Sequence, residues 1–312
     1  MILTLTINPA IDHNVTADRL VFEDRAYIVD TSESAGGRGV NASCVIHSFG
    51  GETVAIAPSG GRAGKRFQQL LCGCGFPTEI VPMKKGIRTN FTITDRQGLT
   101  IKLNQPGPRL SKQEIAHLGE AVRKRLPGAD WLMLCGSLPP GVPGAVYSDL
   151  IKAARQHGVK TLLDTDGEAL AEGVRAGPTV VAPNQQEAER LLNTALITRS
   201  QFLEAAAQIR SMGAESVILS LGSRGAVGAY ARGIVEVVPP SVDVVCPIGS
   251  GDALAAAFTW ALARGGTFAD ALRWGVAAGT ASATLPGLRF ANLDQTREIY
   301  ERVEVHEVSG AK

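Results

Sequence analysis

The chain has 312 residues, of which 45% are hydrophobic and 20% charged, a composition that excludes a disordered protein. Lys plus Arg (31) nearly balances Asp plus Glu (30), and a net charge of +1 provides no long-range field to hold a polyanion. We therefore expect neither nucleic acid nor a membrane as a partner. The first residues lack the features of an export signal and the five cysteines form no CxxC pair, so we expect a cytoplasmic protein with reduced thiols.

Short apolar runs alternate with amphipathic segments along most of the chain. Strands are expected, in chain order, at residues 3–8, 131–135, 159–164, 179–182, 216–220 and 226–230. Helices are expected at residues 112–125, 144–157, 185–192, 200–212, 252–263 and 269–284. Near-continuous apolar strands separated by helices indicate an α/β fold with a doubly wound, mostly parallel sheet and helices on both faces. We expect one such domain over residues 1–312.

Residues 90–104 depart from this pattern. Two short alternating strands, 90–94 and 99–104, flank the turn Asp95-Arg96-Gln97-Gly98, which is typical of a β-hairpin. An isolated hairpin is marginal in water, so its apolar side chains should pack on something. A lid, a subunit interface and an extra edge hairpin of the main sheet all remain open.

Polar and glycine residues follow five of the expected strands. These loops cover residues 8–12, 136–141, 164–166, 183–187 and 221–225. Ligands of open α/β sheets collect at the carboxyl ends of the strands. Five such loops on one rim predict a site for an elongated, polar ligand.

The segment 247–263 is the most informative part of the sequence. Its helix is apolar all round, which predicts burial, and its only carboxylate, Asp252, lies in the first turn. Gly249 and Gly251 allow backbone amides to approach an anion closely. A general base beside an anion hole is what phosphoryl transfer to an alcohol requires, although a helix cap after a glycine turn explains the same residues.

Asn184 and Glu187 stand three residues apart at an expected helix start, and therefore on one face. Such a pair can hold Mg²⁺ mostly through waters, but surface helices commonly carry similar pairs. The stretch 37–42 fits the dinucleotide pattern G-x-G-x-x-A, yet Ser32-Glu33-Ser34 precedes it instead of an apolar strand. We therefore interpret its glycines as permitting close approach to a substrate, with Asn41 as donor and acceptor.

Taken together, the motifs resemble the ribokinase/PfkB family of carbohydrate kinases, and in particular its phosphofructokinase-type branch. That branch includes 6-phosphofructokinase, 1-phosphofructokinase and tagatose-6-phosphate kinase. The resemblance covers almost the whole chain, in the same order. The matching motifs are Asn8-Pro9-Ala10-Ile11-Asp12, Gly36-Gly37-Arg38-Gly39-Val40-Asn41, Gly136-Ser137-Leu138-Pro139-Pro140-Gly141, Pro183-Asn184-Gln185-Gln186-Glu187, Ser220-Leu221-Gly222-Ser223-Arg224-Gly225 and Gly249-Ser250-Gly251-Asp252.

The resemblance implies a role for each matching position. Asp252 is expected to be the catalytic base, with Gly249, Ser250 and Gly251 as the anion hole. The sugar is expected to contact Asp12, Gly37, Arg38, Gly39, Asn41 and Ser137. ATP is expected to contact Asn184, Ser220, Gly222, Gly225, Val276, Gly279 and Thr280, and Asn184 and Glu187 are expected to order Mg²⁺.

The resemblance also implies a small β lid, formed by segments of about 12–34 and 86–105, which clasps a second subunit in a homodimer. Arg25, Arg88 and Lys102 lie in or beside these segments and are expected to bind the phosphate of a sugar-phosphate substrate. Solvated lid charges are the alternative explanation. One position departs from the branch: Ala182 stands where a lysine usually precedes Pro-Asn, which leaves Arg224 or another cation to substitute.

The function expected from these residues is an ATP- and Mg²⁺-dependent kinase. It would phosphorylate a hydroxyl of a ketohexose phosphate, namely fructose 6-phosphate, fructose 1-phosphate or tagatose 6-phosphate. Two alternatives remain: a kinase of another sugar or nucleoside on the same fold, and a weakly catalytic regulator that binds a sugar phosphate.

Overall fold

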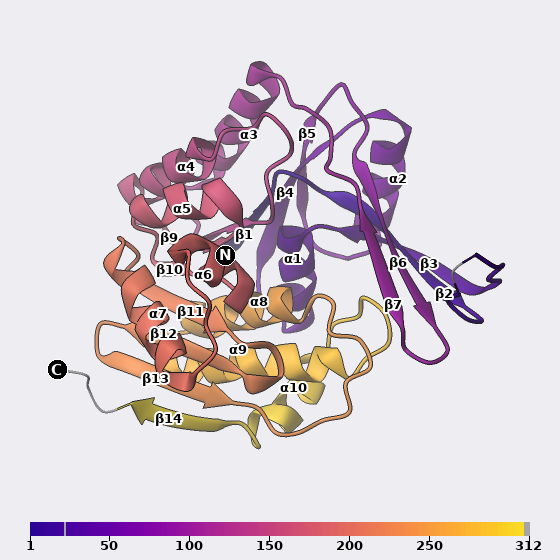
Figure 1. Cartoon of the computed structure of the whole chain (residues 1–312). Helices are drawn as coiled ribbons and strands as arrows, with labels where there is room; N and C mark the ends of the chain where they lie inside the picture. The colour runs from indigo at the N-terminus through magenta and orange to yellow at the C-terminus, as the bar shows by residue number, and fades with distance from the viewer. Residues whose placement is uncertain (22, 309–312) are drawn as a thin grey trace.

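A ten-stranded sheet runs through the centre of the computed structural model, which describes residues 1–21 and 23–308 (Figure 1). Its strand order is β14-β13-β12-β11-β10-β9-β8-β1-β4-β5. Neighbouring strands from β11 to β5 in this order run parallel, whereas β12, β13 and β14 are antiparallel. The strands are β1 (Ile2–Thr6), β4 (Thr53–Ser59), β5 (Thr78–Pro82), β8 (Trp131–Cys135), β9 (Lys160–Asp164), β10 (Val180–Val181), β11 (Ser216–Ser220), β12 (Ala226–Tyr230), β13 (Gly233–Val238) and β14 (Glu304–Val308).

Helices cover both faces of this sheet. One face carries α2 (Gly61–Cys72), α3 (Lys112–Arg125), α4 (Ala145–Gln156), α5 (Gly167–Arg175), α6 (Gln185–Leu192) and α7 (Arg199–Ser211). The other carries α1 (Arg38–Ser48), α8 (Ser250–Ala263), α9 (Phe268–Ala283) and α10 (Leu293–Tyr300). The predicted doubly wound architecture is confirmed. Among the described residues, no helix has the length and apolar character needed to cross a membrane.

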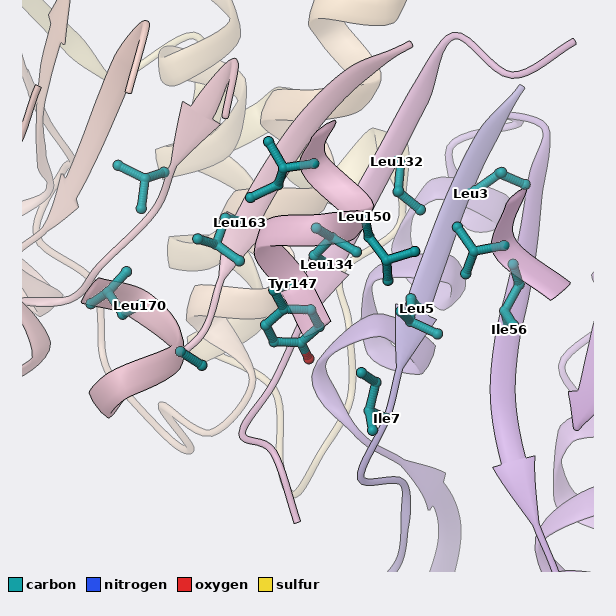
Figure 2. Packing of buried hydrophobic residues seen from close by; sticks show 14 of the residues in the cluster. Leu3, Leu5, Ile7, Ile56, Leu132, Leu134, Tyr147, Leu150, Leu163 and Leu170 are labelled. Carbon is teal, nitrogen blue, oxygen red and sulfur yellow. The ribbon is translucent and has the colours of Figure 1, made fainter. Parts of the chain in front are cut away.

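Two hydrophobic cores result from the alternation of side chains along the strands. In β1, Leu3 and Leu5 point to one face, where they lie in the same cluster as Tyr147 and Leu150 of α4 (Figure 2). Ile2 points to the opposite face, into the cluster that contains α8. As predicted for a helix apolar all round, α8 is buried from Ala253 to Ala261.

A second, four-stranded sheet, which we call the lid, projects from one side of the molecule (Figure 1). Its order is β3-β2-β6-β7, in which β2 and β6 are parallel and the other pairs are antiparallel. The strands are β2 (Ala10–Ala17), β3 (Ile28–Gly36), β6 (Arg88–Asp95) and β7 (Thr100–Asn104). The expected hairpin is therefore present, but the alternative that it extends the edge of the main sheet is wrong.

The pairing register gives the lid a polar face and an apolar face. Asp12 lies opposite Asn90, and Thr92 lies opposite Lys102, on the face toward the main sheet. On the other face Phe91 lies opposite Leu103, and these side chains are 37% and 54% exposed. The ring of Phe91 stacks on that of His13 at 5.1 Å between centroids, yet both apolar side chains stay partly exposed on this face.

Residues 38–82, to which the sequence patterns assigned no element, contain α1, β4, α2 and β5. Small and β-branched residues in α1 blur its helical period, and β5 is a short strand at the sheet edge. A strand, β3, does precede the glycine-rich stretch 37–42, and Gly37 caps α1. This strand is mostly exposed and belongs to the lid, so the stretch is not preceded by the buried strand of a dinucleotide-binding unit.

Candidate active site

A cavity of about 410 Å³ lies between the carboxyl ends of the parallel strands and the polar face of the lid. The main sheet contributes residues at the ends of β9, β10 and β11, and the starts of α1 and α8 close the floor. The lid contributes polar side chains of β2, β6 and β7. Segments separated by more than two hundred residues thus meet at the position that open α/β sheets favour for ligands.

The start of α8 places a carboxylate beside a glycine turn. Gly249 caps the helix with φ of 81°, a left-handed conformation that favours glycine, and a Cβ there would lie 2.8 Å from Leu288 Cδ1. Gly251 has open space where its Cβ would be. Free amides at this helix start can therefore reach an anion in the cavity. Asp252 lies in the same first turn, and its Oδ2 accepts a hydrogen bond of 2.7 Å from Asn41 Nδ2.

The surroundings of Asp252 change its acidity. Burial raises the pKa of this carboxyl from 3.8 to about 7, and the nearby Asp164 carboxylate adds to the increase. Arg38 and the hydrogen bond from Asn41 act in the opposite direction. A general base works best with a pKa close to the working pH, so this carboxyl is suited to accept a proton near neutrality.

Arg38, in the first turn of α1, connects three carboxylates. Its Nη1 lies 2.7 Å from Asp164 Oδ1, and its Nη2 lies 3.0 Å from Glu187 Oε1 and 3.5 Å from Asp166 Oδ2. Asp164 and Glu187 are buried, and a buried carboxylate needs such a partner. The guanidinium therefore holds the end of β9 and the start of α6 together at one wall of the cavity.

Asn184 and Glu187 form a reciprocal capping box at the start of α6. Asn184 Oδ1 accepts from the Glu187 amide at 3.0 Å, and Glu187 Oε2 accepts from the Asn184 amide at 2.9 Å. Both residues line the cavity, and burial raises the pKa of Glu187. The described residues contain no cluster of three or more His, Cys, Asp or Glu that could hold a metal. This donor set fits a Mg²⁺ ion held mainly by water and phosphate oxygens, and does not fit an ion caged by protein.

The lid wall combines hydrogen-bonding groups with positive charge. Asn90 Nδ2 donates to Asp12 Oδ1 at 2.8 Å, and burial raises the pKa of Asp12. Arg88 and Lys102 line the same wall. Arg88 Nε and Asn90 Oδ1 are buried and have no hydrogen-bond partner among the described residues. Buried polar atoms are normally paired, so these two are free for a polar ligand.

The cavity brings together twelve of the residues singled out from the sequence. They are Asp12, Gly37, Arg38, Asn41, Arg88, Lys102, Asn184, Glu187, Ser220, Gly249, Gly251 and Asp252. Others do not line it: Arg25 is exposed in the β2–β3 loop, and Ser137 follows β8. Gly39 instead allows α1 to pack on β1, because a Cβ there would lie 2.5 Å from Thr6 Oγ1.

Several expected nucleotide contacts also lie outside the lining. Gly222 begins the short 3₁₀ turn after β11, and Gly225 follows its last residue. Val276, Gly279 and Thr280 belong to α9, where Val276 is buried against α8 and a Cβ on Gly279 would lie 2.8 Å from Ser250 O. In α9 the structure thus shows Val276 and Gly279 in helix packing. The expected role of all five residues in binding ATP stays a prediction.

Sequence reasoning missed the partners of the expected site residues. Asp164 was noted only as part of a polar rim, although it is the closest carboxylate to Arg38. Asn90 was treated as a hairpin residue, although it bonds Asp12. The available signal was weak, because only the register between β2 and β6 places Asn90 opposite Asp12, and only the packing of α1 brings Arg38 to the end of β9.

Comparison with known proteins gives the family. The model of the pfkB family carbohydrate kinases matches residues 5–295. The chain belongs to this family. Relatives include the ATP-dependent 6-phosphofructokinase isozyme 2 of Escherichia coli, which is 33% identical over 96% of this chain and 97% of its own length. The tagatose-6-phosphate kinase of Staphylococcus epidermidis is 30% identical over 99% and 100%, and a 1-phosphofructokinase of Haloferax volcanii is 31% identical over 98% of each chain.

The fold agrees with this membership. A crystal structure of Escherichia coli phosphofructokinase-2 in complex with substrates and products is 34% identical, covers 96% of this chain and 98% of its own, and superposes with a TM-score of 0.91. The expected ribokinase-like fold and the expected class of enzyme, a phosphotransferase acting on a carbohydrate hydroxyl, are both confirmed. The second alternative weighed from the sequence, a regulator with little catalysis, has no support in these relatives.

Proposed function

We propose that this protein transfers the γ-phosphoryl group of ATP to a hydroxyl of a ketohexose phosphate. Fructose 6-phosphate, fructose 1-phosphate and tagatose 6-phosphate are the candidate acceptors, because the relatives are named for these substrates. The observation that carries the proposal is the position of Asp252 beside the glycine turn, on the floor of a cavity whose opposite wall carries Arg88 and Lys102.

The proposed step uses residues of this chain in defined roles. Asp252 accepts the proton of the acceptor hydroxyl, and the hydroxyl oxygen then attacks the γ-phosphorus as the bond to ADP breaks. Asn41 holds the Asp252 carboxylate by its 2.7 Å hydrogen bond. The amides of Gly249 and Gly251, which line the cavity at the start of α8, would stabilise the charge that develops on the transferred group, whereas the Ser250 amide donates to Pro247 O at 3.3 Å. Closure of the lid excludes water from the cavity.

Mg²⁺ would neutralise charge on the ATP phosphates, and Asn184 and Glu187 are the residues that would order it through waters. Their oxygens already cap α6, and Glu187 also contacts Arg38, which supports outer-sphere binding.

An acceptor that already carries a phosphate is favoured by the lid wall. Arg88 can offer its unpaired Nε to a phosphate oxygen, and Lys102 adds a second charge. A kinase of a neutral sugar or a nucleoside, the remaining alternative, would not need these two cations. The proposal therefore prefers a ketohexose phosphate over an unphosphorylated sugar.

Steady-state kinetics with the three ketohexose phosphates, and with fructose and ribose as unphosphorylated controls, tests the proposal. ADP release is followed in a coupled assay with MgATP. We expect turnover with at least one sugar phosphate and a much lower kcat/KM for the controls. Activity confined to unphosphorylated sugars contradicts the role of the lid cations. Negligible turnover, together with a higher melting temperature when sugar phosphate is added, favours the regulator.

We also propose a homodimer that covers the apolar face of the lid. Phe91 and Leu103 are half-exposed on that face, and single-domain proteins seldom leave such contiguous apolar strands in water. Leu103→Lys is expected to lower the mass measured by analytical ultracentrifugation from dimer to monomer at micromolar concentration. Ile197→Lys, at an exposed apolar residue between α6 and α7 and outside the lid, is the matched control. A wild-type protein that sediments as a monomer contradicts this proposal.

A further inference from the structure

The resemblance of the chain to its family does not explain why the guanidinium of Arg38 lies at this wall of the cavity. The chain has Ala182 where a lysine is expected before Pro-Asn, and both Ala182 and Arg38 line the active-site cavity. We propose that Arg38 is the cationic ligand of the transferring phosphoryl group, in place of a lysine at position 182. This inference rests on the proposed phosphoryl transfer and assigns a residue to it.

The position of Arg38 on α1 directs it toward the reacting groups. Arg38 and Asn41 stand three residues apart, so their side chains leave the same face of the helix. Asn41 bonds Asp252 at 2.7 Å, which places that face against the expected base. Arg38 and the glycine turn at Gly249 also line one cavity. The guanidinium is therefore adjacent to the place where the hydroxyl and the γ-phosphate would meet.

The distribution of charge shows why a cation is needed there. Among the cavity-lining residues that the structure describes, Arg88 and Lys102 come from the lid. The opposite wall carries the carboxylates of Asp164, Glu187 and Asp252, and Arg38 is the one cation on it. A polyphosphate approaching that wall would meet like charge without Arg38, and the methyl group of Ala182 offers no compensation.

Arg224, the other candidate to substitute for the lysine, is occupied elsewhere. Its Nη2 donates to Gln185 Oε1 at 2.5 Å, and its guanidinium lies 4.6 Å from the ring centre of Phe202. It does not line the cavity. These contacts hold the Arg224 guanidinium against Gln185 of α6 and Phe202 of α7, so it is a poor source of charge for the transferred group.

Arg38 can bind a phosphate without leaving its present partners. A guanidinium has five N–H donors, and the short contacts to Asp164 and Glu187 use two of them. The 3.5 Å contact to Asp166 is long for a hydrogen bond, so its donor is easily redirected. The two buried carboxylates thus fix the orientation of the guanidinium while its remaining donors stay available to phosphate oxygens.

Nucleotide binding provides a test that needs no sugar acceptor. Isothermal calorimetry in Mg²⁺ compares ADP with the non-hydrolysable ATP analogue that has an imido group between the β- and γ-phosphates. For Arg38→Met we expect the analogue to lose about tenfold or more in affinity, with ADP changed by less than about threefold. Ala182→Lys in the Arg38→Met background is expected to restore most of the preference for the analogue.

A purely structural role of Arg38 predicts different results. If Arg38 only braces Asp164 and Glu187, ADP and the analogue weaken equally and Ala182→Lys restores nothing, which overturns the proposal. If the loss appears in Arg224→Met instead, the cation has been assigned to the wrong residue. Because the acceptor is absent, these outcomes are independent of whether a ketohexose phosphate is the substrate.

A second variant covers the case in which Arg38→Met does not fold, since it removes the cation that contacts the two buried carboxylates of Asp164 and Glu187. Arg38→Lys keeps the charge but loses the bidentate fork, and melting curves show whether it is folded. We expect its preference for the analogue over ADP to fall several-fold. An unchanged preference overturns the proposed contact.

Discussion

Replacing Asp252 by asparagine is expected to stabilise the folded protein above pH 7 while it removes catalysis. The reason is that the Asp252 carboxyl has a different pKa in the folded and the unfolded chain. In the unfolded chain the carboxyl titrates at its ordinary pKa of 3.8, whereas burial and Asp164 raise the pKa to about 7 in the folded state. Between these values the folded protein holds a proton that the unfolded chain has released, so its stability falls as the pH rises.

The size of this cost follows from the pKa difference. A change from 3.8 to about 7 corresponds to about 4 kcal/mol of unfolding free energy, present in full above pH 7 and absent below pH 4. Asp252 lines a cavity open to solvent, and water relieves part of the penalty. For Asp252→Asn we therefore expect a gain of about 2 to 4 kcal/mol at pH 8 and almost none at pH 4. The amide can still accept the hydrogen bond of Asn41.

Urea denaturation at pH 4 and pH 8 measures the stability change, and the coupled kinase assay measures activity. We expect kcat to fall by about a hundredfold to ten-thousandfold, since a general base contributes that much. Asp149→Asn, at an exposed carboxyl of α4, is the matched control and should change stability by less than about 0.5 kcal/mol. A stability difference that is the same at both pH values would refute the assigned burial, and near-normal activity would refute the assigned base.

Three further predictions follow from the same geometry. Because Asp252 must be ionised to accept a proton, kcat/KM should fall tenfold for each pH unit below about 7, and a flat profile down to pH 5 would contradict this. Arg88→Met should raise KM for the sugar phosphate about tenfold to hundredfold and leave the dissociation constant of MgATP unchanged; an equal loss for both substrates would place Arg88 outside the phosphate subsite. Gly39→Ala should cost about 1 to 3 kcal/mol in urea denaturation, because its Cβ would lie 2.5 Å from Thr6 Oγ1. Gly86→Ala, whose Cβ would have its nearest contact at 3.8 Å, is the control, and equal effects of the two would contradict the packing argument.

Local patterns were enough to predict the framework of this protein. Strands such as β8 and β11 are buried over most of their length, so their continuous apolar sequences were enough to predict buried strands. The apolar character of α8 likewise predicted a central helix, and Asp252 stood out because it interrupts that character. The same reasoning assigned no element to α1, with its small residues, or to the edge strand β5, and it also missed β4, although β4 is buried along its whole length.

The order of short motifs along the chain was sufficient to predict the family and the identity of most cavity residues. Motif positions are a property of the sequence, and glycine turns such as Gly249 have backbone angles that other residues rarely adopt. The sequence therefore predicted most of the chemical groups of the site and the reaction they suit, but not the parts played by Asp164 and Asn90.

Only the tertiary structure decided how these groups act on one another. The contact of Arg38 with Asp164 joins residues 126 positions apart, and the bond from Asn41 to Asp252 joins residues 211 apart. The high pKa of Asp252 depends on burial and on the distance to Asp164, which no local pattern contains. The electrostatic energy of two charges depends on the distance between them and on how far water reaches them. Both quantities are fixed only when the sheet, the helices and the lid pack together.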